Sequence, residues 1–290
     1  MNGLQGKADG IVTRFAPSPT GPLHLGHAFS AIKAHDMARD AGGVFLLRIE
    51  DIDRSRSRPE WEGAIYEALH WLGLTWAEPV MRQSDRLNVY RQAIEMLWDK
   101  ELIYPCTCNR RDIAAAVSAP QEGADPRHGP DGVIYPGICR PARPLSGPLP
   151  MGAALRLDMR RAWDLIGDDP SFIEENQEPV TLTYNTAIDG IGDIVIARRD
   201  MGTSYHLSVV LDDAAQGVTH VVRGRDLFDA TLIHIVLQRI LGLPTPRYHH
   251  HRLIRDDSGK RLAKRDDAKA IATFRAAGAT AQDIRRMIGL

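Results

Sequence analysis

The sequence has few cysteines, no excess of charge of either sign and no long uninterrupted apolar run. Three cysteines among 290 residues cannot build a disulfide framework, and their odd number is typical of a reducing compartment. Lysine and arginine together number 36, against 37 aspartate and glutamate residues, and the formal net charge is −1. A basic field over the whole protein is therefore excluded, and any contact with nucleic acid must come from local patches.

Segments that direct a chain to a membrane are also lacking. Residues 1–10 contain neither an apolar core nor an arginine-rich amphipathic pattern, so we expect no leader peptide. The longest apolar stretch, 230–243, is interrupted by His234, Gln238 and Arg239 and is too short to span a bilayer. We therefore expect a cytoplasmic protein that does not associate with membranes.

The remaining composition is that of an ordinary globular protein. Hydrophobic residues make up 43% and charged residues 25% of the chain, which excludes disordered and fibrous classes. The length predicts about two domains.

The first 50 residues predict an α/β fold. An apolar run at Ile11–Phe15 is followed by a helical pattern over 26–41 and a second apolar run at Val44–Ile49. A strand, a helix and a strand in this order form a βαβ unit, which implies a parallel sheet. The sequence also predicts helices over 59–72, 85–102 and 226–241, strands over 194–196 and 218–222, and one short C-terminal helix.

Residues 14–27, which read RFAPSPTGPLHLGH, predict a phosphate site. A strand ends, a Pro/Gly loop turns, and a helix begins near Gly26, where free N–H groups and the helix dipole favour an anion. His24 and His27 can donate hydrogen bonds to phosphate oxygens, and Gly26 lets a flat ring approach the backbone. A strand–helix turn can also carry these residues by chance, so the motif alone does not decide.

A second, distant motif is the cationic stretch KRLAKR at 260–265. Cations on a polar loop can close over a triphosphate and neutralise the charge that develops at its α-phosphate. Taken alone, the stretch favours a solvated basic surface loop.

Together the two motifs resemble those of class I aminoacyl-tRNA synthetases. HLGH at 24–27 matches the HIGH motif, and 261–265 stands at the KMSKS motif, with Arg261 and Ala263 in place of its first lysine and its serine. The resemblance implies a Rossmann-type catalytic domain that uses ATP with Mg²⁺. It assigns catalysis to His24, His27 and Lys264, and ATP binding to these three residues and Gly26.

Two further segments resemble glutamyl- and glutaminyl-tRNA synthetases. Residues 14–21 are similar to the opening of these enzymes, and RIEDID at 48–53 resembles their RIEDTD, with Ile52 in place of threonine. The chemistry agrees, because a side-chain carboxylate needs a fixed arginine and an α-ammonium group needs a carboxylate. The resemblance implies that glutamate is bound by Arg14, Phe15, Ala16, Pro17, Ser18, Glu50, Tyr205 and Arg223. Without it, Glu50 would be an ordinary cap or ion-pair residue and Arg223 a surface partner of Asp226.

Only residues 266–290 follow the KMSKS-like motif, so we expect no anticodon-binding domain. This architecture resembles the glutamyl-queuosine tRNA(Asp) synthetases. That resemblance implies L-glutamate, ATP and tRNA(Asp) as partners, no obligatory protein partner, and transfer of glutamate to queuosine in the anticodon. The alternatives are a truncated glutamyl-tRNA synthetase that charges the 3′ end, a nucleotidyltransferase for a small molecule, and a non-catalytic RNA-binding module.

The three cysteines predict a metal site. Cys106, Cys108 and Cys139 lie in the proline-rich segment 104–150, where a zinc ion can replace the missing core. The arrangement C-x-C followed by Y-x3-C resembles the zinc site of the same family, which implies Tyr135 as the fourth ligand and one Zn²⁺ per chain. His128 is a chemical alternative to Tyr135, and three reduced, unpaired cysteines are an alternative to the metal.

The predicted organisation is thus a Rossmann-type catalytic domain with an insertion. Residues 10–103 form its first half and 104–150 the zinc-binding insertion. Residues 151–245 hold the rest of the insertion and the second half of the catalytic domain. Residues 246–290 carry the KMSKS-like loop and the C-terminal helix.

Overall fold

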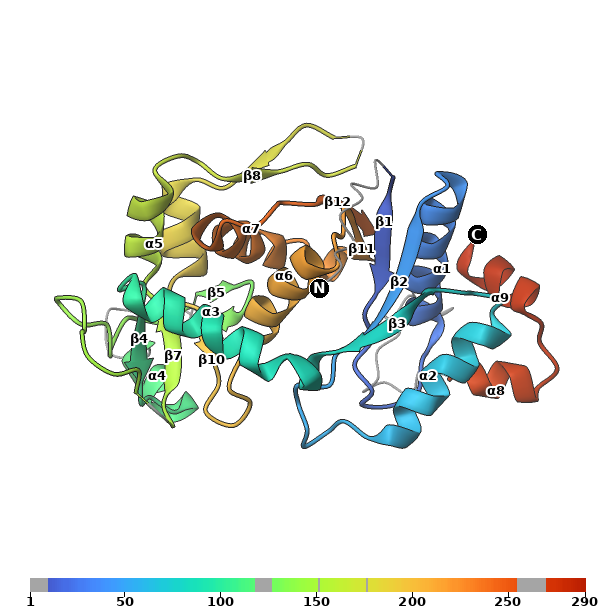
Figure 1. Ribbon diagram of the computed structural model, residues 1–290, viewed down its shortest axis with the longest axis horizontal. Helices are drawn as coiled ribbons and strands as arrows, with labels where there is room; N and C mark the ends of the chain where they lie inside the picture. Colours follow the sequence, from blue (N-terminus) through green and yellow to red (C-terminus); the bar gives the residue numbers. More distant parts are fainter. Residues whose placement is uncertain (1–9, 118–126, 151, 176, 255–269) are drawn as a thin grey trace, which may run out of the picture. The chain divides into compact units, whose positions relative to one another are not determined.

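The computed structural model describes residues 10–117, 127–150, 152–175, 177–254 and 270–290 (Figure 1). The chain divides into two compact units. The first unit comprises Met1–Asp85, Gly217–Arg225 and Pro246–Leu290, and the second comprises Arg86–Gln216 and Asp226–Thr245. In the part of the chain that is described, no helix has the length and apolar character needed to cross a membrane.

A parallel sheet forms the frame of the first unit. Strand β1 (Val12–Phe15), helix α1 (Leu25–Asp40) and strand β2 (Val44–Ile49) make the predicted βαβ unit, and β1 pairs with β2 in parallel. Helix α2 (Pro59–Trp71) then leads to β3 (Ala77–Arg82), which pairs in parallel with β2. Figure 1 shows the three strands side by side. The predicted parallel sheet is confirmed.

Two later strands of the same unit, β11 (His220–Gly224) and β12 (Arg247–His251), also pair in parallel. Next to β11, the Thr219 N–H donates to the Val12 carbonyl at 3.0 Å. Further along the same two strands, Arg14 Nη1 donates to the Val222 carbonyl at 3.4 Å. β1 and β11 therefore run in the same direction. The carboxyl ends of β1, β2, β11 and β12 lie at one edge of the strands, where α/β folds bind ligands.

Small residues bring α1 close to the strands of the first unit. The Thr13 hydroxyl donates to the Ala34 carbonyl at 2.7 Å, an approach that alanine permits.

The predicted single C-terminal helix is wrong: α8 (Ile271–Ala276) and α9 (Ala281–Ile288) are separate helices. Between them Gly278 has φ +87°, a conformation that glycine adopts without strain. The core of this unit includes Ala28, Ala31, Ile32, Leu47, Ile49, Ile65, Leu69, Ile284 and Ile288.

The second unit combines helices with a small antiparallel sheet. Its sheet has the order β10 (Val195–Ala197), β7 (Ala154–Leu157), β4 (Ile103–Cys106). Its helices include α3 (Leu87–Asp99), α5 (Met159–Ile166), α6 (Tyr205–Ala215) and α7 (Ala230–Leu241). The buried Asp212 of α6 accepts hydrogen bonds from Arg86 Nε at 2.7 Å and from the Tyr90 hydroxyl at 2.8 Å. This carboxylate fastens α3 to α6.

Short elements replace or shorten several predicted ones. The helix predicted over 226–241 begins only at Ala230, because Arg225–Leu227 form a 3₁₀ turn. The helix predicted over 85–102 likewise begins at Leu87, after the 3₁₀ turn Gln83–Arg86. The segment predicted to be loop-rich contains α4 (Arg110–Val117), β5 (His128–Gly129) and β6 (Gly132–Val133). The remaining short elements are β8 (Ser171–Phe172), β9 (Val180–Thr181) and a π-helical turn, Thr186–Ile191.

Candidate functional site

The N-terminus of α1 is capped by the two histidines of the HLGH motif. His24 is the N-cap residue, and its Nδ1 accepts a hydrogen bond from the Gly26 N–H at 3.1 Å. His27 Nδ1 in turn accepts from the His24 N–H at 3.1 Å. A Cβ at position 26 would lie 3.0 Å from Cε1 of His24, so glycine allows the ring to lie against the backbone.

These two bonds also determine which ring nitrogens can donate. Because Nδ1 of His24 and of His27 accepts from an N–H, each neutral ring carries its proton on Nε2. The ring centroids are 3.8 Å apart, with an angle of 33° between the planes. The helix N-terminus thus combines its own partial positive charge with two neighbouring Nε2–H donors, which suits a phosphate group.

The described residues on both sides of the KMSKS-like motif lie at this helix N-terminus. Lys264 itself falls outside the described residues. Before the motif, His251 Nε2 lies 2.7 Å from the Ser30 hydroxyl. After it, Ala270 forms a β-bridge with His24. His251 and Ala270 thus both contact the first two turns of α1.

The predicted glutamate residues of β1 and β2 meet at the carboxyl edge of the strands. The Glu50 N–H donates to the Pro17 carbonyl at 3.0 Å, which places the loop after β1 beside the end of β2. Pro17 is buried, Ala16 is half-buried and Ser18 is exposed. Phe15 packs in the hydrophobic core of the first unit. In a ligand site, Phe15 would therefore contact the ligand through its backbone and not through its side chain.

Glu50 forms a buried ion pair. Its side chain is 8% exposed, and Oε1 lies 3.1 Å from Nη2 of Arg48, whose side chain is fully buried. Arg48 thus compensates part of the cost of burying this carboxylate. The ion-pair role considered from the sequence is present, and the carboxylate stands where β2 ends.

Arg223 is a buried cation held by two aromatic residues of β12. Its Nε donates to Nε2 of His250 at 3.2 Å, and its guanidinium carbon lies 5.3 Å from the centroid of the Tyr248 ring. The rings of Tyr248 and His250 are parallel within 2°. Arg223 is only 6% exposed, so it is a buried cation and not the surface residue considered from the sequence. The sequence did not indicate these partners.

Tyr205 belongs to the second unit, where it begins α6. Ser204 caps this helix by accepting a hydrogen bond from the Leu207 N–H. The Tyr205 ring lies 5.3 Å from the ring of His206 and 5.8 Å from that of His234, centroid to centroid. Its predicted place among the glutamate residues stays a prediction.

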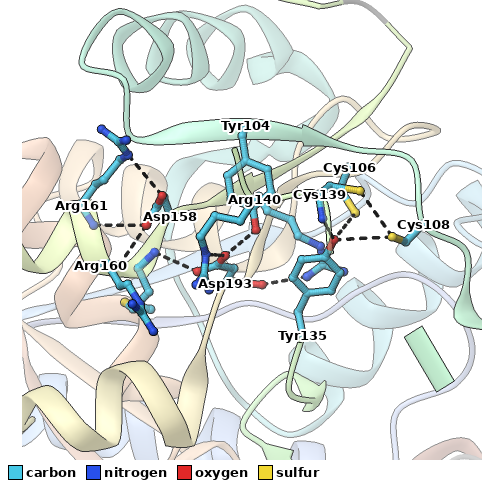
Figure 2. A network of polar contacts seen from close by, with 12 residues as sticks. Tyr104, Cys106, Cys108, Tyr135, Cys139, Arg140, Asp158, Arg160, Arg161 and Asp193 are labelled. Atoms are coloured by element: carbon cyan, nitrogen blue, oxygen red, sulfur yellow. Dashed lines mark hydrogen bonds and ion pairs between the residues drawn. The ribbon is translucent and has the colours of Figure 1, made fainter. Parts of the chain in front are cut away.

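The three cysteines gather with Tyr135 in the second unit (Figure 2). The Tyr135 hydroxyl lies 3.5 Å from Sγ of Cys106 and 3.5 Å from Sγ of Cys108. Sγ of Cys108 and Sγ of Cys139 are 3.4 Å apart. A tetrahedral zinc site has edges of about 3.8 Å between sulfurs and about 3.5 Å between sulfur and oxygen, given its usual bond lengths. The four atoms therefore match the size of such a site.

His128 is not part of this cluster. Among the described His, Cys, Asp and Glu residues, the group close enough to share a metal ion is Cys106, Cys108 and Cys139. His128 lies on β5, exposed and paired through its backbone with Val133. Of the two fourth ligands considered from the sequence, Tyr135 is the one beside the sulfurs.

A tight turn brings Tyr135 and Cys139 to the same point. Gly137 lies between them with φ +81°, a conformation that would strain any other residue. The Arg140 N–H closes the turn on the Gly137 carbonyl at 2.9 Å. The Cys139 N–H then donates to the Tyr135 hydroxyl at 2.7 Å.

The surroundings lower the pKa of Cys139 and raise those of Cys108 and Tyr135. Burial would raise the pKa of the Cys139 thiol, but hydrogen bonds from Tyr135 and the Thr107 backbone outweigh it and lower this pKa to about 6. Burial raises the pKa of Cys108 and, together with the neighbouring thiols, that of Tyr135. One thiolate is thus available near neutral pH, the form that binds metal ions.

The chain is similar to a known group of synthetases over most of its length. Residues 10–128 and 170–290 match the family described as class I tRNA synthetases (E and Q), catalytic domain. The glutamyl-Q tRNA(Asp) synthetase of Rhodobacter capsulatus is 62% identical over 286 residues, which cover 97% of this chain and 100% of the relative. The enzyme of the same name from Geobacter sulfurreducens is 40% identical, over 91% of this chain and 79% of the relative.

A solved structure is also similar. The crystal structure of a glutamate tRNA ligase from Elizabethkingia meningosepticum, in complex with its amino acid, superposes with a TM-score of 0.70 at 27% identity. The match covers 89% of this chain but 52% of the ligase, so the chain spans about half the length of that protein.

Proposed function

The chain belongs to the family of class I tRNA synthetases for glutamate and glutamine, and from this membership we propose that it attaches glutamate to queuosine in tRNA(Asp). It is a ligase of the aminoacyl-tRNA synthetase type with the α/β catalytic fold of that class. The observation that carries the proposal is the 62% identity to the glutamyl-Q tRNA(Asp) synthetase of Rhodobacter capsulatus over that relative's full length.

The first step is activation of glutamate by ATP, which these synthetases use with Mg²⁺. The α-carboxylate of glutamate attacks the α-phosphorus of ATP in line, the bond to the β-phosphate oxygen breaks, and pyrophosphate leaves. No protein side chain needs to react covalently, so positioning and charge stabilisation are sufficient. The Nε2–H donors of His24 and His27 and the α1 N-terminus supply this stabilisation. Lys264 is proposed as a further cation on the triphosphate.

Specificity for glutamate follows from two buried charged groups. Arg223 would hold the side-chain carboxylate, because a guanidinium fixed by His250 can present a planar fork. Glu50 would accept the α-ammonium group. Arg14 and the backbone of residues 15–18 would line the glutamate site at the carboxyl ends of the strands. Tyr205, which belongs to the second unit, is proposed as a further residue that binds glutamate.

In the second step a hydroxyl of the acceptor attacks the carbonyl carbon of glutamyl adenylate, and AMP leaves. We place this hydroxyl on queuosine because the relatives named above are glutamyl-Q tRNA(Asp) synthetases. A specific observation favours a second acceptor: the structurally similar Elizabethkingia protein is a glutamate tRNA ligase. Charging of a tRNA 3′ end is therefore the alternative.

Glutamate-dependent exchange of pyrophosphate into ATP tests the activation step. We expect exchange with glutamate but not with glutamine, since a site built around Arg223 leaves a buried cation without its carboxylate when the neutral amide binds. The assay is run with and without tRNA. Equal exchange with glutamine would place the specificity elsewhere, and absence of any amino-acid-dependent exchange would favour the RNA-binding alternative.

We also propose that Cys106, Cys108, Tyr135 and Cys139 hold one zinc ion. Their spacing fits a tetrahedral site, and three thiolates with one phenolate form a donor set suited to zinc. The metal would supply a structural cross-link in a region with little core. Among the described residues, the buried cluster at this place consists of Tyr104, Cys106 and Tyr135, and the partly buried Cys108, Ile113 and Cys139 pack against it.

Replacing Cys139 by serine is expected to reduce zinc from about one per chain to nearly none, because one of the three thiolates is lost. The melting temperature should fall by several degrees with it. Zinc is measured by mass spectrometry after dialysis.

Two further variants identify the fourth ligand. Tyr135→Phe should release zinc and His128→Ala should retain it. Release by His128→Ala alone would make His128 the ligand, and a wild-type protein that takes up no zinc would refute the site.

A further inference from the structure

Asp193 is a buried carboxylate outside the residues assigned above. Its side chain is fully buried, and it lies two residues before the start of β10. Oδ2 accepts hydrogen bonds from the Tyr104 hydroxyl and, at 2.7 Å, from Arg140 Nε. Oδ1 accepts from the Met159 N–H at 3.0 Å. A charge this deeply buried requires such donors, and losing them is costly.

Two of these donors are neighbours of the cysteines. Tyr104 stands two residues before Cys106 on β4, so both side chains lie on one face of the strand. Arg140 directly follows Cys139 in the chain. Figure 2 shows Asp193 in contact with the Tyr104 hydroxyl and the Arg140 side chain, on the side of Tyr135 away from the sulfurs. One carboxylate therefore holds both segments that bring cysteines to the cluster.

Arg156 provides a third connection, between Asp193 and Tyr135. Its Nη1 donates to the backbone carbonyl of Asp193 at 2.7 Å. Its guanidinium carbon lies 3.8 Å from the centroid of the Tyr135 ring, a cation–π contact that fixes the ring plane. The residue at position 193 is thus connected to the segments of Cys106, Tyr135 and Cys139.

We propose that Asp193 is the positioning residue of the cysteine–tyrosine site, holding its ligand-bearing segments at the spacing that zinc requires. The proposal rests on the zinc site proposed above. Ligands that are oriented by an outer shell of hydrogen bonds bind metal more tightly, and loss of such a partner typically weakens binding about 10- to 100-fold. Asp193 acts through Tyr104, Arg140 and Arg156, and does not itself bind the metal.

The variant Asp193→Asn tests this role with little change of volume. Its Oδ1 can still accept from Met159, but its amide N–H₂ faces two donors, Tyr104 and Arg140, and cannot accept from them. The wild-type and variant proteins are loaded with Zn²⁺, and transfer of the metal to a chromophoric chelator is followed. We expect Asp193→Asn to release zinc about 10- to 100-fold faster than the wild type.

Asp158→Asn is the matched control. Asp158 is also buried, at 5% exposure, and it lies in the same network in Figure 2. Its Oδ1 caps α5 by accepting from the Arg160 and Arg161 N–H groups, which asparagine does equally well. Its Oδ2 pairs with Arg161 Nε at 3.2 Å, so Asp158→Asn also removes an ion pair, but one with no partner in the cysteine-bearing segments. It should release zinc at the wild-type rate. If Asp193→Asn fails to fold, Tyr104→Phe and Arg140→Gln each remove one tie and should each accelerate release.

The possible outcomes distinguish a positioning role of Asp193 from a general loss of stability around the site. Fast release from Asp193→Asn with normal release from Asp158→Asn supports it. The wild-type rate in Asp193→Asn, Tyr104→Phe and Arg140→Gln overturns it, and so does equal acceleration in Asp193→Asn and Asp158→Asn. If the wild-type chain takes up no zinc, the zinc site fails and this role fails with it, while glutamate activation remains testable on its own.

Discussion

Replacing His24 by asparagine is expected to lower the rate of glutamate-dependent pyrophosphate exchange about 100- to 1,000-fold while leaving the fold intact. Asparagine is among the best N-cap residues, and its Oδ1 can accept the Gly26 N–H bond now accepted by His24 Nδ1. It has no group at the place of Nε2. A donor aimed at the charge of the transition state is therefore lost, and loss of one such donor typically has this effect.

The control is a cap substitution away from the site. Thr280 caps α9 by accepting the Asp283 N–H bond, and Thr280→Asn should leave both exchange and melting temperature near the wild-type values. If His24→Asn retained exchange within about tenfold of the wild type, the His24 ring would not be a contact of the triphosphate. A large drop in its melting temperature would mean that His24 acts through the helix cap.

Arg223→Lys is expected to reduce kcat/KM for glutamate about 100-fold, which corresponds to about 3 kcal/mol. Lysine keeps the charge but lacks the Nε donor to His250 and the planar fork. Hydrogen bonds to charged groups contribute about 1.5–3 kcal/mol each. The loss should appear mainly as a higher KM for glutamate, because the side-chain carboxylate is held equally before and during the reaction.

Arg247→Lys is the control for this change. Arg247 lies exposed on β12, opposite His220 of β11, and the same substitution there should leave KM for glutamate unchanged. The KM for ATP should be unaffected in both variants. An unaltered KM for glutamate in Arg223→Lys would contradict the assignment and make Arg14 the next candidate for the carboxylate.

The sequence predicted the first βαβ unit because its signals are local. The apolar runs of β1 and β2 and the Pro/Gly loop between 17 and 22 mark strands and a turn without reference to the rest of the fold. Strand β3 was missed because it contains Glu78 and Pro79 and has no clear alternation. Helix α6 was missed because polar residues, Asp212 and Asp213, occupy buried positions in it.

The candidate site shows the same division between local and tertiary signals. The spacing of His24 and His27 places both at one helix start, and the sequence is sufficient to predict that. The partners of Arg223 come from a strand more than 20 residues later, where a histidine run has no signal of its own. Asp193 is separated from Tyr104 by 89 residues. Only the antiparallel sheet β10–β7–β4 and its loops bring these two side chains together.

The site of esterification on tRNA tests the proposed function most directly. Labelled glutamate and ATP are incubated with the protein and tRNA(Asp), either containing or lacking queuosine, and either intact or with the 3′-terminal adenosine removed enzymatically. The proposal predicts labelling that requires queuosine and persists after the 3′ adenosine is removed. Labelling that occurs without queuosine and disappears with the 3′ adenosine would contradict it and make the protein a charging enzyme of the tRNA 3′ end.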